Sequence, residues 1–157
     1  MGTKDILLVD DCVDQLQLLS VILESQGFDV TAAPNAFKAL QLLKNNEYRI
    51  VITDFNMPNM NGIELAARVG KQHPGTRVVL VTADASPGII EKAVSAGICE
   101  MLSKPIDVKR LVATVRSSLT ESEVHSACAR SREGDRAAHA SCHGRHPGEN
   151  EWTPKGK

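Results

Sequence analysis

The sequence contains no long run of uncharged apolar residues. Crossing a bilayer takes roughly 20 such residues in a row, and charged or polar residues interrupt every apolar stretch of this 157-residue chain well before that length. The first residues, Met1 to Asp5, also lack the basic segment that leads into a signal-peptide core. We therefore expect a cytoplasmic protein with no membrane contact.

An excess of charge of one sign and paired cysteines are also missing. The formal net charge is -1, which excludes a broad electrostatic attraction to nucleic acid or anionic lipid. The four cysteines form no C-x-x-C pair, so neither a dithiol redox motif nor a compact zinc finger is indicated. We expect reduced thiols, no disulfide, and partners that are recognised through a local site.

The sequence does contain a β-α unit that occurs five times. Apolar, β-branched runs predict strands, and apolar residues at helical spacing follow each run. This alternation predicts an α/β, doubly wound fold: a five-stranded parallel sheet with five helices on its two faces and strand order 2-1-3-4-5. The predicted strands span residues 6–9, 28–32, 49–53, 78–81 and 98–102; the predicted helices lie within 13–26, 36–44, 63–72, 87–96 and 107–119.

The apolar periodicity stops near Thr120. We assign residues 4–120 to one domain and residues 121–157 to a polar tail that is expected to be disordered, because its composition cannot bury enough apolar surface to offset the entropy of ordering. No DNA-binding helix-turn-helix and no catalytic output segment is recognised in this tail. Direct DNA binding is therefore not expected.

Polar residues follow the carboxyl ends of the predicted strands. Asp10 and Asp11 follow the first strand, Asp54 the third, Thr82 the fourth and Lys104 the fifth. Because parallel strands end at the same edge of a sheet, we expect these side chains to converge. Three crowded carboxylates and one lysine favour a divalent cation with oxygen ligands, and Mg²⁺ fits best. A carboxylate beside such a cation can act as a nucleophile towards phosphorus, with the hydroxyl and the ammonium stabilising the transferring oxygens.

Each of these residues has a simpler interpretation when it is taken alone. Asp10 and Asp11 could cap the first helix, and Asp54 could end a strand before a turn. Thr82 and Lys104 are ordinary residues for a strand end. The occurrence of all of them in order, at consistent spacing, favours a functional site over these separate roles.

This set of residues, together with Lys104-Pro105 and the stretch from Asp54 to Gly62, resembles the receiver domain of response regulators and is especially similar to the chemotaxis (CheY-like) receiver with its flavodoxin-like fold. The resemblance covers residues 4–119. It implies two-component signal transduction, in which Asp54 accepts a phosphoryl group from a phosphohistidine of a sensor histidine kinase or phosphotransfer protein. It also implies that Thr82 and Lys104 contact that group, and that Lys104-Pro105 is a cis peptide.

The resemblance further implies the magnesium ligands. Asp11 and Asp54 would bind Mg²⁺ directly, together with the main-chain carbonyl of Asn56, and Asp10 would act through water. Asn56 and Asp84 would flank the route of water to the phosphoryl group, so fairly fast hydrolysis is expected.

One position departs from the family pattern. Met101 stands three residues before Lys104, where the family usually has Tyr or Phe. In the family this aromatic residue moves inward with the threonine, which corresponds to Thr82, and changes the binding face of the fourth helix, fifth strand and fifth helix. Methionine is flexible and apolar, so the switch formed by Thr82 and Met101 is expected to be less sharp.

Two alternative functions remain. A hydrolase of the haloacid-dehalogenase kind also uses an aspartate nucleophile at a strand end, but it needs a second carboxylate two residues later, where this chain has Asn56. A phosphorylation-independent docking module with the same fold is the other. Under the favoured interpretation the protein catalyses only its own phosphorylation and dephosphorylation, and it signals to a downstream protein that the sequence does not identify.

Overall fold

The computed structural model describes residues 3–131, with side chains described for residues 3–120. Within this range five strands alternate with five helices, as predicted. The strands are β1 (Thr3–Val9), β2 (Val30–Ala33), β3 (Glu47–Asp54), β4 (Arg77–Thr82) and β5 (Glu100–Ser103). The helices are α1 (Val13–Ser25), α2 (Ala36–Asn45), α3 (Gly62–Gln72), α4 (Pro87–Ser95) and α5 (Val108–Ser131).

All strand pairs of the sheet are parallel, and the order is β2-β1-β3-β4-β5. The predicted fold class and strand order are therefore confirmed. The register pairs Val9 with Thr53, and Asp54 with Val81, so β1, β3 and β4 end at nearly the same level. The winding reverses between β1 and β3, and ligands of such sheets bind at this point beyond the strand ends.

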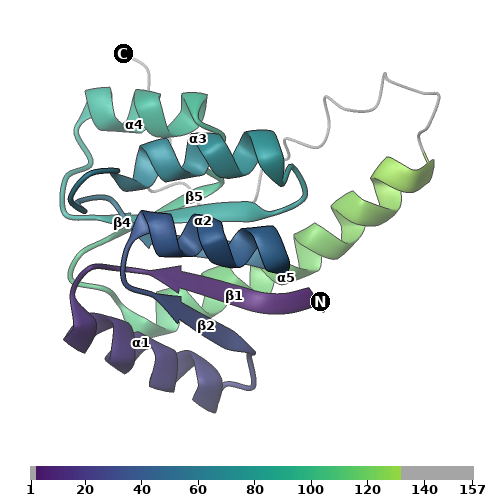
Figure 1. The fold of residues 1–157 in the computed structure, drawn as a ribbon. Helices are drawn as coiled ribbons and strands as arrows, with labels where there is room; N and C mark the ends of the chain where they lie inside the picture. Colours follow the sequence, from purple (N-terminus) through teal and green to yellow (C-terminus); the bar gives the residue numbers. More distant parts are fainter. Residues whose placement is uncertain (1–2, 132–157) are drawn as a thin grey trace.

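Two apolar layers hold the helices on the sheet. Figure 1 shows α2 and α3 in front of the strands and α1 and α5 behind and below them. The front layer includes Leu43 of α2 and Leu65 of α3, and the back layer includes Leu23 of α1 and Leu111 of α5. Each of these leucines is at most 2% exposed, and burying such a side chain contributes roughly 1.5–3 kcal/mol.

Capping residues and glycines set the helix boundaries. Asn35 caps α2 by accepting a hydrogen bond from the Lys38 N–H at 2.8 Å. Asn61 and Glu64 form a reciprocal capping box at the start of α3. Gly27 and Gly97 follow α1 and α4 with φ angles of +94° and +87°, a conformation that favours glycine and ends a helix.

The last helix is longer than the sequence predicted. We expected α5 to end near Leu119, but it continues to Ser131, and Figure 1 shows its final turns (light green) extending beyond the sheet. The apolar pattern marks only the part of a helix that packs, whereas the segment after it has no residue that stops helix growth. No glycine or proline occurs between Pro105 and Gly134. The rest of the predicted tail, residues 132–157, lies outside the described residues.

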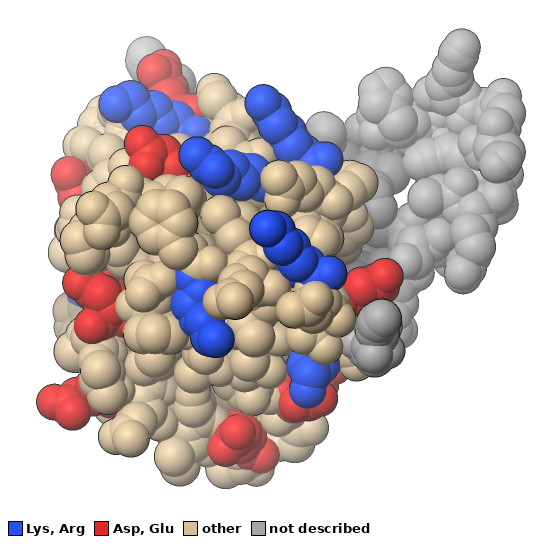
Figure 2. All heavy atoms as spheres, viewed as in Figure 1, with Lys and Arg blue, Asp and Glu red and all other residues tan. Residues whose placement is uncertain are grey.

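One face of the molecule carries charges of both signs. Figure 2 shows Lys and Arg side chains spaced over the face of α2, α3 and α4, with acidic side chains around them. None of the helices in the described part of the chain combines the length and the apolar character needed to cross a membrane.

Candidate functional site

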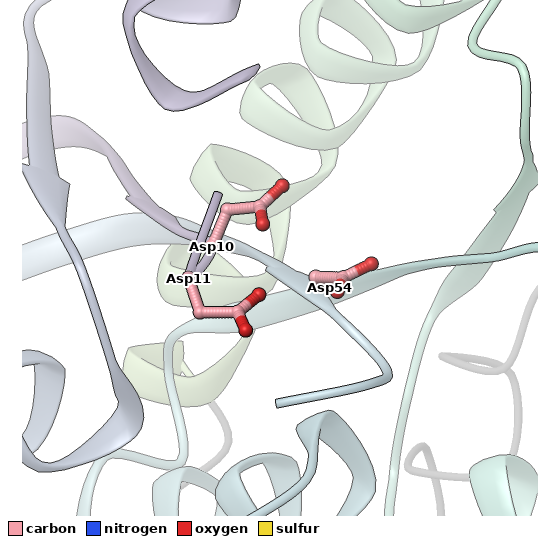
Figure 3. Close-up of side chains that lie close together, drawn as sticks. All are labelled: Asp10, Asp11 and Asp54. Carbon is pink, nitrogen blue, oxygen red and sulfur yellow. The ribbon is translucent and has the colours of Figure 1, made fainter. Parts of the chain in front are cut away.

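Three carboxylates meet where β1 and β3 end. Asp10 and Asp11 directly follow β1, and Asp54 is the last residue of β3. One carboxylate oxygen of each residue lies within 4.8 Å of the other two, which is close enough for the three to share a metal ion. Figure 3 shows the three side chains projecting to the same side of the strands. Asp10 and Asp54 are buried, whereas Asp11 is exposed, so the group opens to solvent on one side.

Asp10 is held by the main chain of the next helix. Its Oδ1 accepts a hydrogen bond from the Cys12 N–H at 2.9 Å, and Cys12 is the N-cap of α1 without a side-chain capping bond. Neither aspartate therefore provides the usual side-chain cap of α1. Burial raises the pKa of Asp10 above its ordinary 3.8, and the charges of Asp54 and Asp11 raise it further, against the opposing effects of the Cys12 bond and Lys104.

Lys104 provides the positive charge beside these acids. Its Nζ lies 2.6 Å from Asp54 Oδ1, and its side chain is 32% exposed while that of Asp54 is 6% exposed. Partial burial lowers the pKa of Lys104, but the bond to Asp54 and the charges of all three aspartates outweigh this, and the pKa is raised above 10.5. The Lys104-Pro105 peptide is cis, as predicted.

Thr82 ends β4 next to β3 and is 3% exposed. Its hydroxyl is engaged by the loop that follows: Oγ1 accepts a hydrogen bond from the Asp84 N–H at 3.0 Å and donates to the Asp84 carbonyl at 3.3 Å. The Lys104 N–H donates to the Thr82 carbonyl at 3.0 Å. The ends of β4 and β5 are thus tied together, with the hydroxyl turned to its own loop.

The turn after Asp54 brings α3 close beneath the site. Gly62 N–H donates to the Phe55 carbonyl at 3.0 Å, and a Cβ added at Gly62 would lie 2.5 Å from the Asp54 carbonyl oxygen and 2.7 Å from Leu80 Cδ1. Only glycine fits there without moving the backbone that carries Asp54. Asn56, the expected main-chain ligand, is exposed in this same turn.

Met101 lies in β5 and is 4% exposed. It belongs to the front apolar layer, together with Leu80 of β4, Ala93 of α4 and Ile98. The predicted switch position is therefore occupied by a buried apolar side chain.

The strand-end group and the fold point to the same family, and the sequence comparison decides it. Residues 6–116 match the response regulator receiver domain. The chain belongs to the response regulator receiver family. Receiver domains take part in two-component signalling, and this receiver has the CheY-like arrangement of strands and helices.

Individual proteins that are similar to this chain agree with the family assignment. The chain is 38% identical over 118 residues to an uncharacterized 14.6 kDa protein of Leptolyngbya boryana, covering 74% of this chain and 90% of that one. It is 33% identical over 117 residues to the transcriptional regulatory protein GlrR of Escherichia coli, covering 74% of this chain but 26% of GlrR. The receiver thus spans about a quarter of that larger regulator.

A solved structure is similarly close. The signal receiver domain of an HD domain-containing protein from Pseudomonas fluorescens is 35% identical with a TM-score of 0.75, covering 79% of this chain and 92% of that one.

Two contacts of this receiver's site were not foreseen from the sequence. They are the bond from the Cys12 N–H to Asp10 and the engagement of the Thr82 hydroxyl by Asp84. Both join residues two positions apart, a spacing at which Asp and Thr side chains commonly bond to the main chain. This general tendency is the one signal in the sequence from which the two contacts could have been predicted.

Proposed function

We propose that this receiver accepts a phosphoryl group on Asp54 from a phosphohistidine of a sensor histidine kinase or phosphotransfer protein. The observation that carries the proposal is the convergence of Asp10, Asp11 and Asp54 at the strand ends, with Lys104 Nζ 2.6 Å from Asp54. An oxygen of the Asp54 carboxylate attacks phosphorus, and the bond from phosphorus to the histidine nitrogen breaks. Lys104, and the Thr82 hydroxyl once it is free, hold oxygens of the transferred group.

The acidic group fits a divalent cation. Three carboxylates and one ammonium leave an excess of negative charge. Burial raises the pKa of Asp10, and the charges of Asp54 and Asp11 raise it further, so a cation beside these acids would favour the ionised form. Asp10, Asp11, Asp54 and the main-chain carbonyl of Asn56 are the residues that would hold Mg²⁺. Bound there, Mg²⁺ would neutralise the acids and attract phosphoryl oxygens.

The consequence of phosphorylation is a change in the binding face formed by α4, β5 and α5, which a downstream protein then recognises. Thr82 ends the strand beside this face, and Met101 lies beneath it. The protein's own catalysis would be limited to its phosphorylation and dephosphorylation. Signalling of this kind needs no DNA contact by the receiver itself.

The test is incubation with acetyl phosphate and Mg²⁺ followed by intact-mass measurement. We expect the wild type to gain one PO₃ unit, Asp54→Asn to gain none, and Asp29→Asn, which changes an exposed aspartate in the same way, to behave like the wild type. Steady hydrolysis of p-nitrophenyl phosphate would instead identify a hydrolase. Absence of any modification in the wild type would leave the phosphorylation-independent docking module as the function.

A further inference from the structure

The Thr82 hydroxyl is not available to a phosphoryl group in this arrangement. A hydroxyl has one proton to donate, and Thr82 directs it to the Asp84 carbonyl, while the Asp84 N–H donates back to Oγ1. To bond to an oxygen of a group on Asp54, the hydroxyl has to leave Asp84. The energy of that exchange depends on how firmly the loop holds Asp84 in place.

The Asp84 side chain fixes this loop to α4. Its Oδ1 accepts a hydrogen bond from the Ser86 N–H at 2.9 Å. Ser86 is the N-cap of α4, makes no side-chain capping bond of its own, and accepts the first helical bond from the Ile90 N–H at 3.0 Å. The Asp84 carboxylate therefore lies at the start of α4, where a negative charge is favourable. A continuous series of bonds runs from the Thr82 hydroxyl through Asp84 to the first turn of α4.

The side chain of Met101 in β5 offers no comparable polar connection. Met101 is buried in apolar surroundings, and its side chain has no hydrogen-bond donor to exchange between two positions. A signal from Thr82 to α4 has a polar route along the loop instead.

We propose that Asp84 is a positioning residue that couples Thr82 to α4: its carboxylate holds the β4–α4 loop in the resting arrangement, and the loop is released when Thr82 turns to a phosphoryl group on Asp54. This inference rests on the proposed function of Asp54. It assigns the coupling to a carboxylate in the loop rather than to the residue at position 101.

Two substitutions separate this role from a simple effect of charge. Asp84→Asn removes the charge but keeps a side-chain oxygen that can accept the Ser86 N–H, whereas Asp84→Ala removes both. The probe is beryllofluoride with Mg²⁺, which imitates the phosphoryl group and is not hydrolysed, so the position of Asp84 near the water route does not affect the result.

Asp84→Ala should bind beryllofluoride about five-fold more tightly than the wild type, because one hydrogen bond of about 1 kcal/mol no longer has to break. Asp84→Asn should remain close to the wild type. Equal affinities of Asp84→Ala and the wild type, weaker binding by Asp84→Ala, or the same gain in both variants would each overturn the proposal.

A second measurement uses the unmodified protein. The Ser86 amide proton should show the chemical shift and low temperature coefficient of a hydrogen-bonded group in the wild type and in Asp84→Asn, and should lose both in Asp84→Ala. Beryllofluoride should produce the same loss in the wild type. A Ser86 amide that does not respond to Asp84→Ala overturns the coupling itself. A wild type that binds no beryllofluoride overturns the proposed function, and with it the release of the loop.

Discussion

Replacing Asp10 by asparagine is expected to stabilise the metal-free protein. Asp10 is 5% exposed, and its ligand oxygen lies within 4.8 Å of those of Asp11 and Asp54. At that separation and an effective dielectric constant of 20, two carboxylates repel each other by roughly 3.5 kcal/mol. Lost attraction to Lys104 offsets part of the gain, while asparagine keeps an oxygen for the Cys12 N–H. The net increase in the free energy of unfolding should be about 1 to 2 kcal/mol.

Urea denaturation followed by circular dichroism, at pH 7 in the presence of EDTA, measures this change. The gain corresponds to a rise in Tm of roughly 4 to 8 °C. Asp14→Asn is the matched control, since it removes the same charge from the exposed first turn of α1 and should cost a few tenths of a kcal/mol. Adding Mg²⁺ should then stabilise the wild type considerably more than Asp10→Asn, because the variant lacks one of the acids.

The pH dependence has a definite sign. Because the pKa of Asp10 is raised in the folded protein, its ionisation opposes folding at pH values above the folded pKa, and this cost declines as the pH falls towards 3.8. The advantage of Asp10→Asn should therefore be largest near neutral pH and shrink in acid. A variant that is less stable than the wild type in EDTA at pH 7 would refute the reasoning from repulsion and burial.

Three further predictions concern packing and charge. Gly62→Ala should destabilise the fold by about 2 kcal/mol and slow phosphorylation, because the new Cβ would contact the Asp54 carbonyl. Gly70→Ala is the control: its Cβ would meet nothing closer than 3.9 Å, so it should be neutral or stabilising in the same urea experiment. Lys104→Met should lower the free energy of unfolding at pH 8 by about 1 to 2 kcal/mol. The stabilisation that the charged lysine provides is complete only below pH 10.5, so the difference between the variant and the wild type should disappear as the pH rises through the raised lysine pKa. Leu111→Ala, at a fully buried position on the back of the sheet, should cost about 3 kcal/mol in unfolding while phosphorylation by acetyl phosphate at low temperature continues.

The sequence predicted the sheet and the gathering of the site because both follow from regular features. Buried parallel strands produce continuous apolar runs, and their common direction brings Asp10, Asp54 and Thr82 to one edge. The glycines after α1 and α4 and the capping asparagine of α2 mark helix ends through local backbone chemistry, so the sequence is informative at these positions.

Other features depend on competition between alternative local interactions, and a sequence pattern does not show which interaction forms. Thr82 can bond to the site or to its own loop, and the hydroxyl bonds to Asp84. Its residue type is compatible with either choice. The end of α5 was predicted from loss of apolar periodicity, but helix growth continues wherever neither packing nor a helix-breaking residue opposes it.

The length of α5 also determines how far its end would move if the helix tilted. Its 24 residues correspond to a helix about 36 Å long. Leu111 and Val115, in the first half of this helix, pack against the sheet. The part beyond Leu119 extends roughly 18 Å. A tilt of about 10° about Leu119 would therefore displace Ser131 by about 3 Å, given the same rise per residue. A small rotation of α5 against the sheet would therefore become a larger displacement at the end of the helix.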